Sequence, residues 1–294
     1  MEIAAATRMG PVELSVSDLE RSLDYWQNTV GLGLLSRDDG RASLGAGSRE
    51  LIRFVEEPGA RSARGYAGLY HVALLVPERR DLARWLAHAG QAQIGLEGLS
   101  DHAVSEAIYL RDPDEHGIEI YADRPREQWD GRVRELMTTR PLDVGSLFEE
   151  LDEPPTAGGA VSGPGVGGSA DDASSPTCEL PAGTVVGHTH LCVSDVESTV
   201  RFFVDELGLE LMAQLGPMAA FLAAGGYHHH VGANTWESRG AAKAPAGTAR
   251  LLRATILVPD EQELERVAGR LGVEVEDGGI AVEDPSGNPL FLTV

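Results

Sequence analysis

Histidines are the residues best able to do chemistry in this chain, and five of the nine fall in two short strings. His188 and His190 stand two residues apart, so both would point to the same face of a strand. The second string, His228 to His230, is three consecutive histidines in an apolar context, which packing alone explains poorly. Because imidazole binds metals and carries protons near pH 7, the strings predict a metal site, an acid–base site or both.

A single carboxylate stands in an otherwise apolar segment. Glu119 lies in the sequence GIEIY, residues 117–121, which reads as a short strand with apolar neighbours on both faces. A carboxylate buried there would need a partner such as a metal ion. Two histidines and one carboxylate are the ligand set of non-haem Fe(II) oxygenases, a set that leaves coordination positions open for substrate and oxygen.

The elements that must position these residues are repeated along the chain. Residues 12–35 align at a constant offset with residues 189–212, and both copies contain Val-Ser-Asp between a short strand and a helix. Asp18 and Asp195 are placed to cap these helices, and each helix runs into a Gly-Leu pair that ends it. The repeat predicts two related modules, each of which begins with a strand and a helix.

A second pair of segments follows the same plan. Residues 71–86 and 253–267 both read as a strand, a Val-Pro pair and a helix, and an Asp-Pro pair and a final strand follow each. The sequence therefore predicts an α+β fold of four βαβββ modules, two within residues 9–125 and two within 183–294. Residues 126–182 between them read as a helical segment and a linker rich in Gly, Pro and Ser.

Four motifs carry a resemblance to a known family. They are GLYHVALLVP (68–77), SDHAVSEAIYLRDPDEHGIEIYADRP (100–125), GHTHLCVSD (187–195) and GGYHHHVGANTW (225–236). With its four modules, the chain resembles the vicinal oxygen chelate superfamily of glyoxalases, antibiotic-resistance proteins and extradiol dioxygenases, and within it the catechol 2,3-dioxygenases. The resemblance implies two open mixed-sheet barrels, each made of two modules.

The family's metal ligands are a histidine early in the first strand of a module and a glutamate on the last strand. His71 and His188 occupy the histidine position, each five residues before a valine, and Glu119 occupies the glutamate position. The resemblance implies that these three residues bind Fe(II), and the same ligands suit Mn(II). A site of histidines alone, built from His188, His190 and the 228–230 string, is the alternative that the carboxylate makes less favourable.

These ligands belong to different halves of the chain. His71 and Glu119 lie in the second module and His188 in the third, whereas the first and fourth modules have other residues at the ligand positions. A complete site therefore predicts that module two pairs with module three and module one with module four. Pairing within each half remains the alternative.

The resemblance also implies residues that act on the substrate. His229 shares a strand face with Val231 and corresponds to the family's acid–base histidine, and a register shift of one would select His228 or His230 instead. Tyr109, ten residues before Glu119, matches a tyrosine that hydrogen-bonds the substrate.

His102 is the predicted partner of this tyrosine on the substrate side. The remaining histidines of the two strings, His190, His228 and His230, are predicted to line the substrate site.

The implied activity is extradiol ring cleavage, in which O2 opens a small aromatic diol (a catechol) to a 2-hydroxymuconic semialdehyde-type product. Two alternatives remain open in this superfamily. A glyoxalase- or epimerase-like lyase or isomerase would use a closed-shell divalent metal, commonly with two carboxylates among four protein ligands. A non-catalytic small-molecule-binding protein would need no intact ligand set.

Charge and hydropathy exclude other classes of partner. The chain has 24 basic and 46 acidic residues and a net charge of −22, so it lacks the basic face that nucleic acids or anionic membrane surfaces require. No apolar run approaches the ~18 residues of a membrane span, and the first residues show no signal-peptide pattern. We expect a cytoplasmic protein, and both a monomer and a homo-oligomer are compatible with the sequence.

The acidic composition predicts adaptation to high salt. Lys243 is the single lysine, and the self-repulsion of so many carboxylates is screened at molar salt, where the Debye length falls to ~3 Å. We expect the midpoint of thermal unfolding to rise between low salt and several molar KCl. A midpoint that stays constant over this range would contradict halophilic adaptation.

Overall fold

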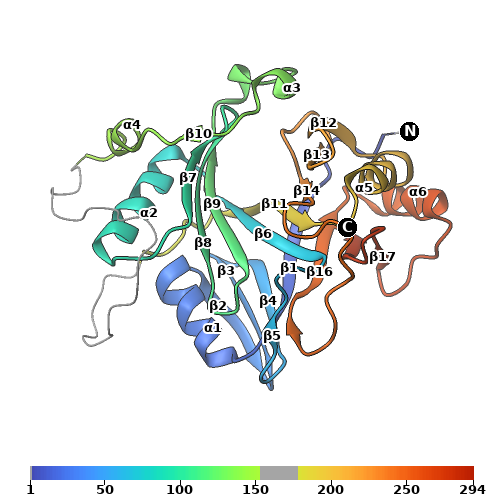
Figure 1. The fold of residues 1–294 in the computed structure, drawn as a ribbon, viewed down its shortest axis with the longest axis horizontal. Helices are drawn as coiled ribbons and strands as arrows, with labels where there is room; N and C mark the ends of the chain where they lie inside the picture. Colours follow the sequence, from blue (N-terminus) through green and yellow to red (C-terminus); the bar gives the residue numbers. More distant parts are fainter. Residues whose placement is uncertain (1, 153–177) are drawn as a thin grey trace.

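The computed structural model describes residues 2–152 and 178–294, and most of its strands lie in two large curved sheets (Figure 1). The central part of the predicted linker, residues 153–177, lies outside the described residues. The fold is α+β, as predicted, and the longer helices pack on the outer faces of the sheets (Figure 1). Among the described residues, no helix is both long enough and apolar enough to cross a membrane.

The first sheet has seven strands in the order β17-β18-β16-β1-β4-β3-β2. It combines the strands of the first and fourth modules. Their bounds are β1 Arg8–Val16, β2 Gly33–Asp38, β3 Arg41–Ala46, β4 Arg49–Glu56, β16 Leu251–Leu257, β17 Gly279–Glu283 and β18 Pro289–Thr293.

The second sheet has nine strands in the order β10-β7-β8-β9-β6-β11-β14-β13-β12 and combines the second and third modules. Its strands are β6 Gly68–Leu75, β7 Gly98–Asp101, β8 Ser105–Arg111, β9 Gly117–Asp123, β10 Arg140–Pro141, β11 Val185–Cys192, β12 Glu210–Leu215, β13 Ala219–Ala223 and β14 Val231–Asn234. Two short strands, β5 Arg61–Ser62 and β15 Thr248–Ala249, pair with each other separately.

Antiparallel pairs of first strands join the two halves of the chain. In the first sheet β1 pairs with β16, and in the second β6 pairs with β11. Each sheet thus takes one module from residues 9–125 and one from 183–294, which is the pairing that the positions of the expected ligands predicted. The predicted domain boundaries, residues 9–125 and 183–294, remain predictions.

The helices follow the predicted repeat, and α1 and α5 also share an irregular last turn. They are α1 Leu19–Tyr25, η1 Trp26–Val30, α2 Arg79–Gln91, η2 Arg126–Gln128, α3 Val133–Leu136, α4 Val144–Phe148, α5 Val196–Arg201, η3 Phe202–Glu206 and α6 Glu261–Leu271. Asp18 and Asp195 cap α1 and α5, since their carboxylates accept hydrogen bonds from the N–H groups of Arg21 and Ser198 at 3.0 and 2.8 Å. Both helices continue into a π-helical turn, so the two modules share even this departure from regular geometry.

The structure differs from the prediction in two places. The fourth module has two strands after its helix instead of three, because residues 272–278 are too few to form a strand and a turn and contain only an isolated bridge residue, Glu276. The helical segment predicted at the start of residues 126–182 also contains β10, which pairs with β7 through Arg140 and Asp101.

Candidate metal centre

The pairing of four neighbouring strands sets one row of side chains across the second sheet. His188 on β11 is opposite Ala73 on β6, Ala73 is beside Glu119 on β9, and Glu119 is opposite Tyr109 on β8. Paired residues point to the same face of a sheet. Because Ala73 is small, the side chains on either side of it meet, and His188 Nε2 lies 3.1 Å from Glu119 Oε2.

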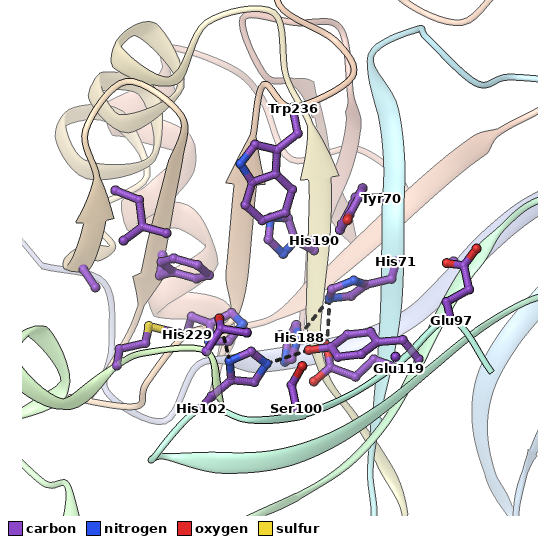
Figure 2. Close-up of a pocket in the computed structure, with 18 of the residues that line it drawn as sticks. Tyr70, His71, Glu97, Ser100, His102, Glu119, His188, His190, His229 and Trp236 are labelled. Carbon is purple, nitrogen blue, oxygen red and sulfur yellow. Dashed lines mark hydrogen bonds and ion pairs between the residues drawn. The ribbon is translucent and has the colours of Figure 1, made fainter. Parts of the chain in front are cut away.

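His71 completes this group from the same strand as Ala73, two residues earlier and therefore on the same face. Its Nε2 lies 2.8 Å from Glu119 Oε2 and 3.3 Å from His188 Nε2. All three side chains are buried, and Figure 2 shows them pointing toward one another. The structure thus brings together the three residues predicted to be the metal ligands.

Two glycines allow aromatic rings to lie close to these strands. Gly187 is the extra residue at a bulge in β11, and a Cβ there would lie 1.8 Å from the hydroxyl oxygen of Tyr121. The Tyr121 ring packs against that of His188 at 4.9 Å between centroids. A Cβ on Gly232 would lie 2.7 Å from the ring of His190. Larger residues at either glycine would displace rings that line or support the site.

The electrostatics of the group favour a bound cation. Burial acts to raise the pKa of the Glu119 carboxyl, but the rings of His188 and His71 outweigh it and hold this pKa well below its ordinary value. Burial lowers the pKa of His188 to about 4. At neutral pH the cavity therefore holds the ionised carboxylate of Glu119 beside the neutral imidazole of His188, whose unprotonated nitrogen can bind a metal ion.

The donor set fits a divalent metal ion. Among the described residues, the ion-pair partners of Glu119 are these two histidines, and no arginine or lysine neutralises its charge. A buried charge without a counter-ion is costly. Two imidazoles and a carboxylate on one side of an ion are the arrangement that non-haem Fe(II) sites use, and the facing side here is an open cavity.

That cavity has a volume of about 550 Å³ and contains all three residues in its wall. Tyr70 and Trp236 also line it, together with an apolar group from β12 and β13 (Figure 2). This group consists of Ala213, Leu215 and Phe221. Residues 137–139 close another side, so the segment between the two halves contributes directly to the site.

Tyr109 and His102 form a hydrogen-bonded pair in the same wall. His102 Nδ1 lies 2.8 Å from the carbonyl oxygen of Thr138, so this nitrogen must carry the proton. Its Nε2 then accepts a hydrogen bond from the Tyr109 hydroxyl at 2.7 Å. Burial and the nearby Glu119 carboxylate raise the pKa of Tyr109 well above its ordinary value, so the phenol stays protonated.

The three consecutive histidines diverge. They precede β14, which begins at Val231, so the strand alternation expected for them does not apply. His229 lines the cavity, and its ring centroid is 4.0 Å from that of His188. His228 turns to Asp123, and His230 Nδ1 accepts a hydrogen bond from the N–H of Ala224 at 3.2 Å.

This divergence corrects part of the prediction. Neither His228 nor His230 is among the residues that line the cavity, although both were expected to bind substrate. His190 does line it, and its ring packs edge-on against Tyr70 at 5.1 Å between centroids. His190 Nε2 is buried and has no hydrogen-bond partner among the described residues.

Several wall residues were missed from the sequence. Tyr70 precedes His71, and Trp236 ends a motif that was noted for its histidines alone. Alternation along the strands could have assigned Ala213 and Leu215 to one face. Met137 and Thr138 lie in irregular chain, where no periodicity indicates which side chains face the site.

Removal of Glu119 tests the ligand set. We expect Glu119→Ala to weaken Mn(II) binding, measured by calorimetric titration of the full chain, by at least about 100-fold, more than the loss of an outer supporting residue. His71→Ala and His188→Ala should act alike, whereas His190→Ala should keep the affinity. An affinity for Mn(II) in Glu119→Ala equal to that of the wild type, with a large loss in His190→Ala, would instead indicate a site of histidines alone.

Comparison with known proteins agrees with this geometry. Residues 8–120 match the Glyoxalase/Bleomycin resistance protein/Dioxygenase superfamily. Among solved structures, a Bacillus subtilis protein has a TM-score of 0.62 at 13% identity and covers 99% of this chain and 86% of its own. Glyoxalase I from Zea mays has a TM-score of 0.52 at 18% identity, with 98% and 92% covered. These similarities concern the fold.

A catechol-2,3-dioxygenase of Bacillus subtilis (strain 168) is 38% identical over 292 residues, which cover 95% of this chain and 94% of that protein. A similarity of this extent spans all four modules and the segment between them. The chain therefore belongs to the glyoxalase/bleomycin resistance protein/dioxygenase superfamily and, within it, resembles the catechol 2,3-dioxygenases.

Proposed function

We propose that the protein is an extradiol dioxygenase that uses Fe(II) and O2 to cleave a catechol to a 2-hydroxymuconic semialdehyde-type product. The observation that carries this proposal is the buried group of His71, Glu119 and His188, which opens on a cavity beside His229 and Tyr109. The similarity to a catechol-2,3-dioxygenase supports it. Mn(II) is the alternative metal, because the same ligands suit it.

The metal and the protein have separate tasks. When bound by His71, Glu119 and His188, Fe(II) would supply a single centre at which the diol and O2 are held together. The side chains around it bind and orient the ring, exclude water and move protons.

His229 is the proposed acid–base residue. Burial lowers its pKa well below the ordinary value, so the ring is neutral at pH 7 and able to accept a proton from a phenolic hydroxyl. It lies in the cavity wall beside His188, which would bring it next to a diol held at the metal centre. The same ring can later return the proton to the product.

Tyr109 is proposed to bind a substrate oxygen. Its own proton is committed to His102 Nε2, so the phenol oxygen is free to accept a hydrogen bond from a substrate hydroxyl. His102 is held in turn by the main chain at Thr138. This double anchoring fixes the orientation of the acceptor before the substrate arrives.

A lyase or isomerase of the glyoxalase type is less consistent with the site. It would call for a further protein ligand, commonly a second carboxylate. Apart from Glu119, the carboxylate in the described cavity wall is that of Glu97, which is half-exposed and paired with Arg111 at 2.8 Å. A binding protein without catalysis would have no need of the complete donor set.

Oxygen consumption tests the proposal. The full chain, reconstituted anaerobically with Fe(II) and mixed with catechol in aerated buffer, is expected to take up O2 and form a yellow semialdehyde in equal amounts. His71→Ala, His188→Ala and Glu119→Ala should reduce both signals to the uncatalysed background, because each removes a ligand.

The matched control is His88→Gln, which alters a buried histidine of α2 that does not line the cavity. It should keep the wild-type rate. Tight metal binding without O2 uptake for any catechol or hydroquinone would refute the dioxygenase and favour the lyase or isomerase.

The cavity also indicates the size of the substrate. Its volume of about 550 Å³ lies in the ~300–1,000 Å³ range of pockets that hold drug-sized ligands, which is more room than a bare catechol ring fills. The apolar side formed by Ala213, Leu215 and Phe221 would accept an apolar substituent. We therefore infer that substituted catechols are the better substrates.

Narrowing the apolar side tests this inference. Ala213→Phe should lower kcat/KM for a phenyl- or tert-butyl-substituted catechol by about 10-fold or more, because the added ring occupies the substituent's volume. Unsubstituted catechol is the internal control and should be cleaved at nearly the wild-type rate. Equal losses for both substrates would show that this side of the cavity does not select by size.

A further inference from the structure

A chain of hydrogen-bonding groups, partly exposed at its Asp123 end, lies behind His229 and is not part of the metal-binding group. Asp123 Oδ1 lies 2.8 Å from His228 Nε2, and His228 Nδ1 lies 2.8 Å from His229 Nδ1. His228 is fully buried, and Asp123 stands at the end of β9. The chain therefore connects a carboxylate at the edge of the site to the proposed acid–base residue.

Donor and acceptor rules limit where the protons of these groups can lie. An ionised carboxylate can only accept, so His228 Nε2 must donate to Asp123. A neutral His228 then has no proton on Nδ1, and this nitrogen accepts from His229 Nδ1–H. His229 is then left with an unprotonated Nε2, and the hydrogen bond that the ring makes among the described residues is the one at Nδ1.

Neighbouring aromatic groups hold the chain in place. Tyr227 donates a hydrogen bond to the same oxygen of Asp123 at 3.2 Å, and its own oxygen is 2.9 Å from that of Tyr121. The ring of His228 packs between those of Tyr227 and Trp129, with centroids at 4.0 and 5.5 Å. This packing restricts the ring of His228 to one orientation, in which Nδ1 faces His229 and Nε2 faces Asp123.

We propose that Asp123 and His228 are positioning residues that hold His229 in the tautomer with its proton on Nδ1 and Nε2 free for the substrate. This inference rests on the proposed function, since it assigns a purpose to the free Nε2. The competing arrangement is a protonated His228 that donates to both neighbours, which would leave the proton of His229 on Nε2 and remove its ability to act as a base.

Nitrogen-15 NMR of the metal-free full chain, labelled at histidine, tests the tautomer directly. In the wild type we expect His229 to show a protonated Nδ1 and a bare Nε2, with the reverse for His228. In Asp123→Ala the preference should disappear, and His229 should show a mixture of both forms. A protonated His229 Nε2 in the wild type would overturn the proposal without reference to any variant or activity.

A matched pair of substitutions at His228 separates positioning from packing. His228→Asn places an amide oxygen near the former Nδ1, where it can still accept from His229. His228→Gln places its amide near the former Nε2, where it can reach Asp123 but offers His229 no acceptor. Loss of the aromatic ring is common to both, so a packing role would affect them equally.

Kinetics with the Fe(II)-loaded protein and catechol supply the second readout. We expect Asp123→Ala and His228→Gln to lower kcat by about 100-fold, within the range of general acid–base catalysis, with little change in KM. His228→Asn should recover most of the loss. Across the variants kcat should follow the fraction of His229 with a bare Nε2, and an unchanged kcat in His228→Gln would refute the positioning role.

His88→Gln serves as the control for removal of a buried histidine, because His88 lies on α2 and does not line the cavity. It should preserve both the tautomer of His229 and kcat. If the wild type shows the expected tautomer but consumes no O2 with any catechol, the proposed function fails while the hydrogen-bonded chain stands. The two inferences are therefore tested separately.

Discussion

The antiparallel pairing of β6 with β11 is the constraint on which the site depends. It aligns His188 with Ala73 across the boundary between the two halves of the chain, and the parallel pairing of β6 with β9 adds Glu119 to the same row. A shift of this register by one residue would turn His188 to the other face and leave the buried carboxylate of Glu119 with His71 as its one histidine partner. The bulge at Gly187 is part of this constraint, because it lets β11 follow β6 while Tyr121 packs beneath His188.

Sequence reasoning was most successful where a physical period governs the structure. Helix caps such as Asp18 and Asp195 have one geometric role, and the repeat of strand, helix and strand identified the modules before any fold was known. The family resemblance, applied to the same repeat, supplied the ligand group: His71 and His188 occupy equivalent positions on the first strands of their modules, and Glu119 occupies the glutamate position on a last strand. Their distribution over two halves also predicted which modules share a sheet, since a complete set of donors requires the second and third to meet.

The prediction was least successful where irregular chain determines the outcome. His228 to His230 lie in irregular chain before β14, so strand alternation could not assign their directions, and two of the three are not part of the cavity wall. The strand missing from the fourth module reflects the short stretch after α6, which composition alone does not reveal. Likewise, Thr138 approaches His102 only because β10 adds to the edge of the second sheet, a pairing of two residues with no sequence pattern of its own.

The first sheet shows what the same framework becomes without a metal-binding group. Its pairing of β1 with β16 sets Glu13 opposite Arg253, at the positions that Ala73 and His188 hold in the second sheet. Arg253 lies over the ring of Phe291 at 4.7 Å and within 3.7 Å of Glu13. There the carboxylate has a permanent cation from the protein itself. In the second sheet Ala73 takes the place of the glutamate and the imidazole of His188 takes the place of the arginine. The charge of Glu119 is therefore left for a ligand to neutralise.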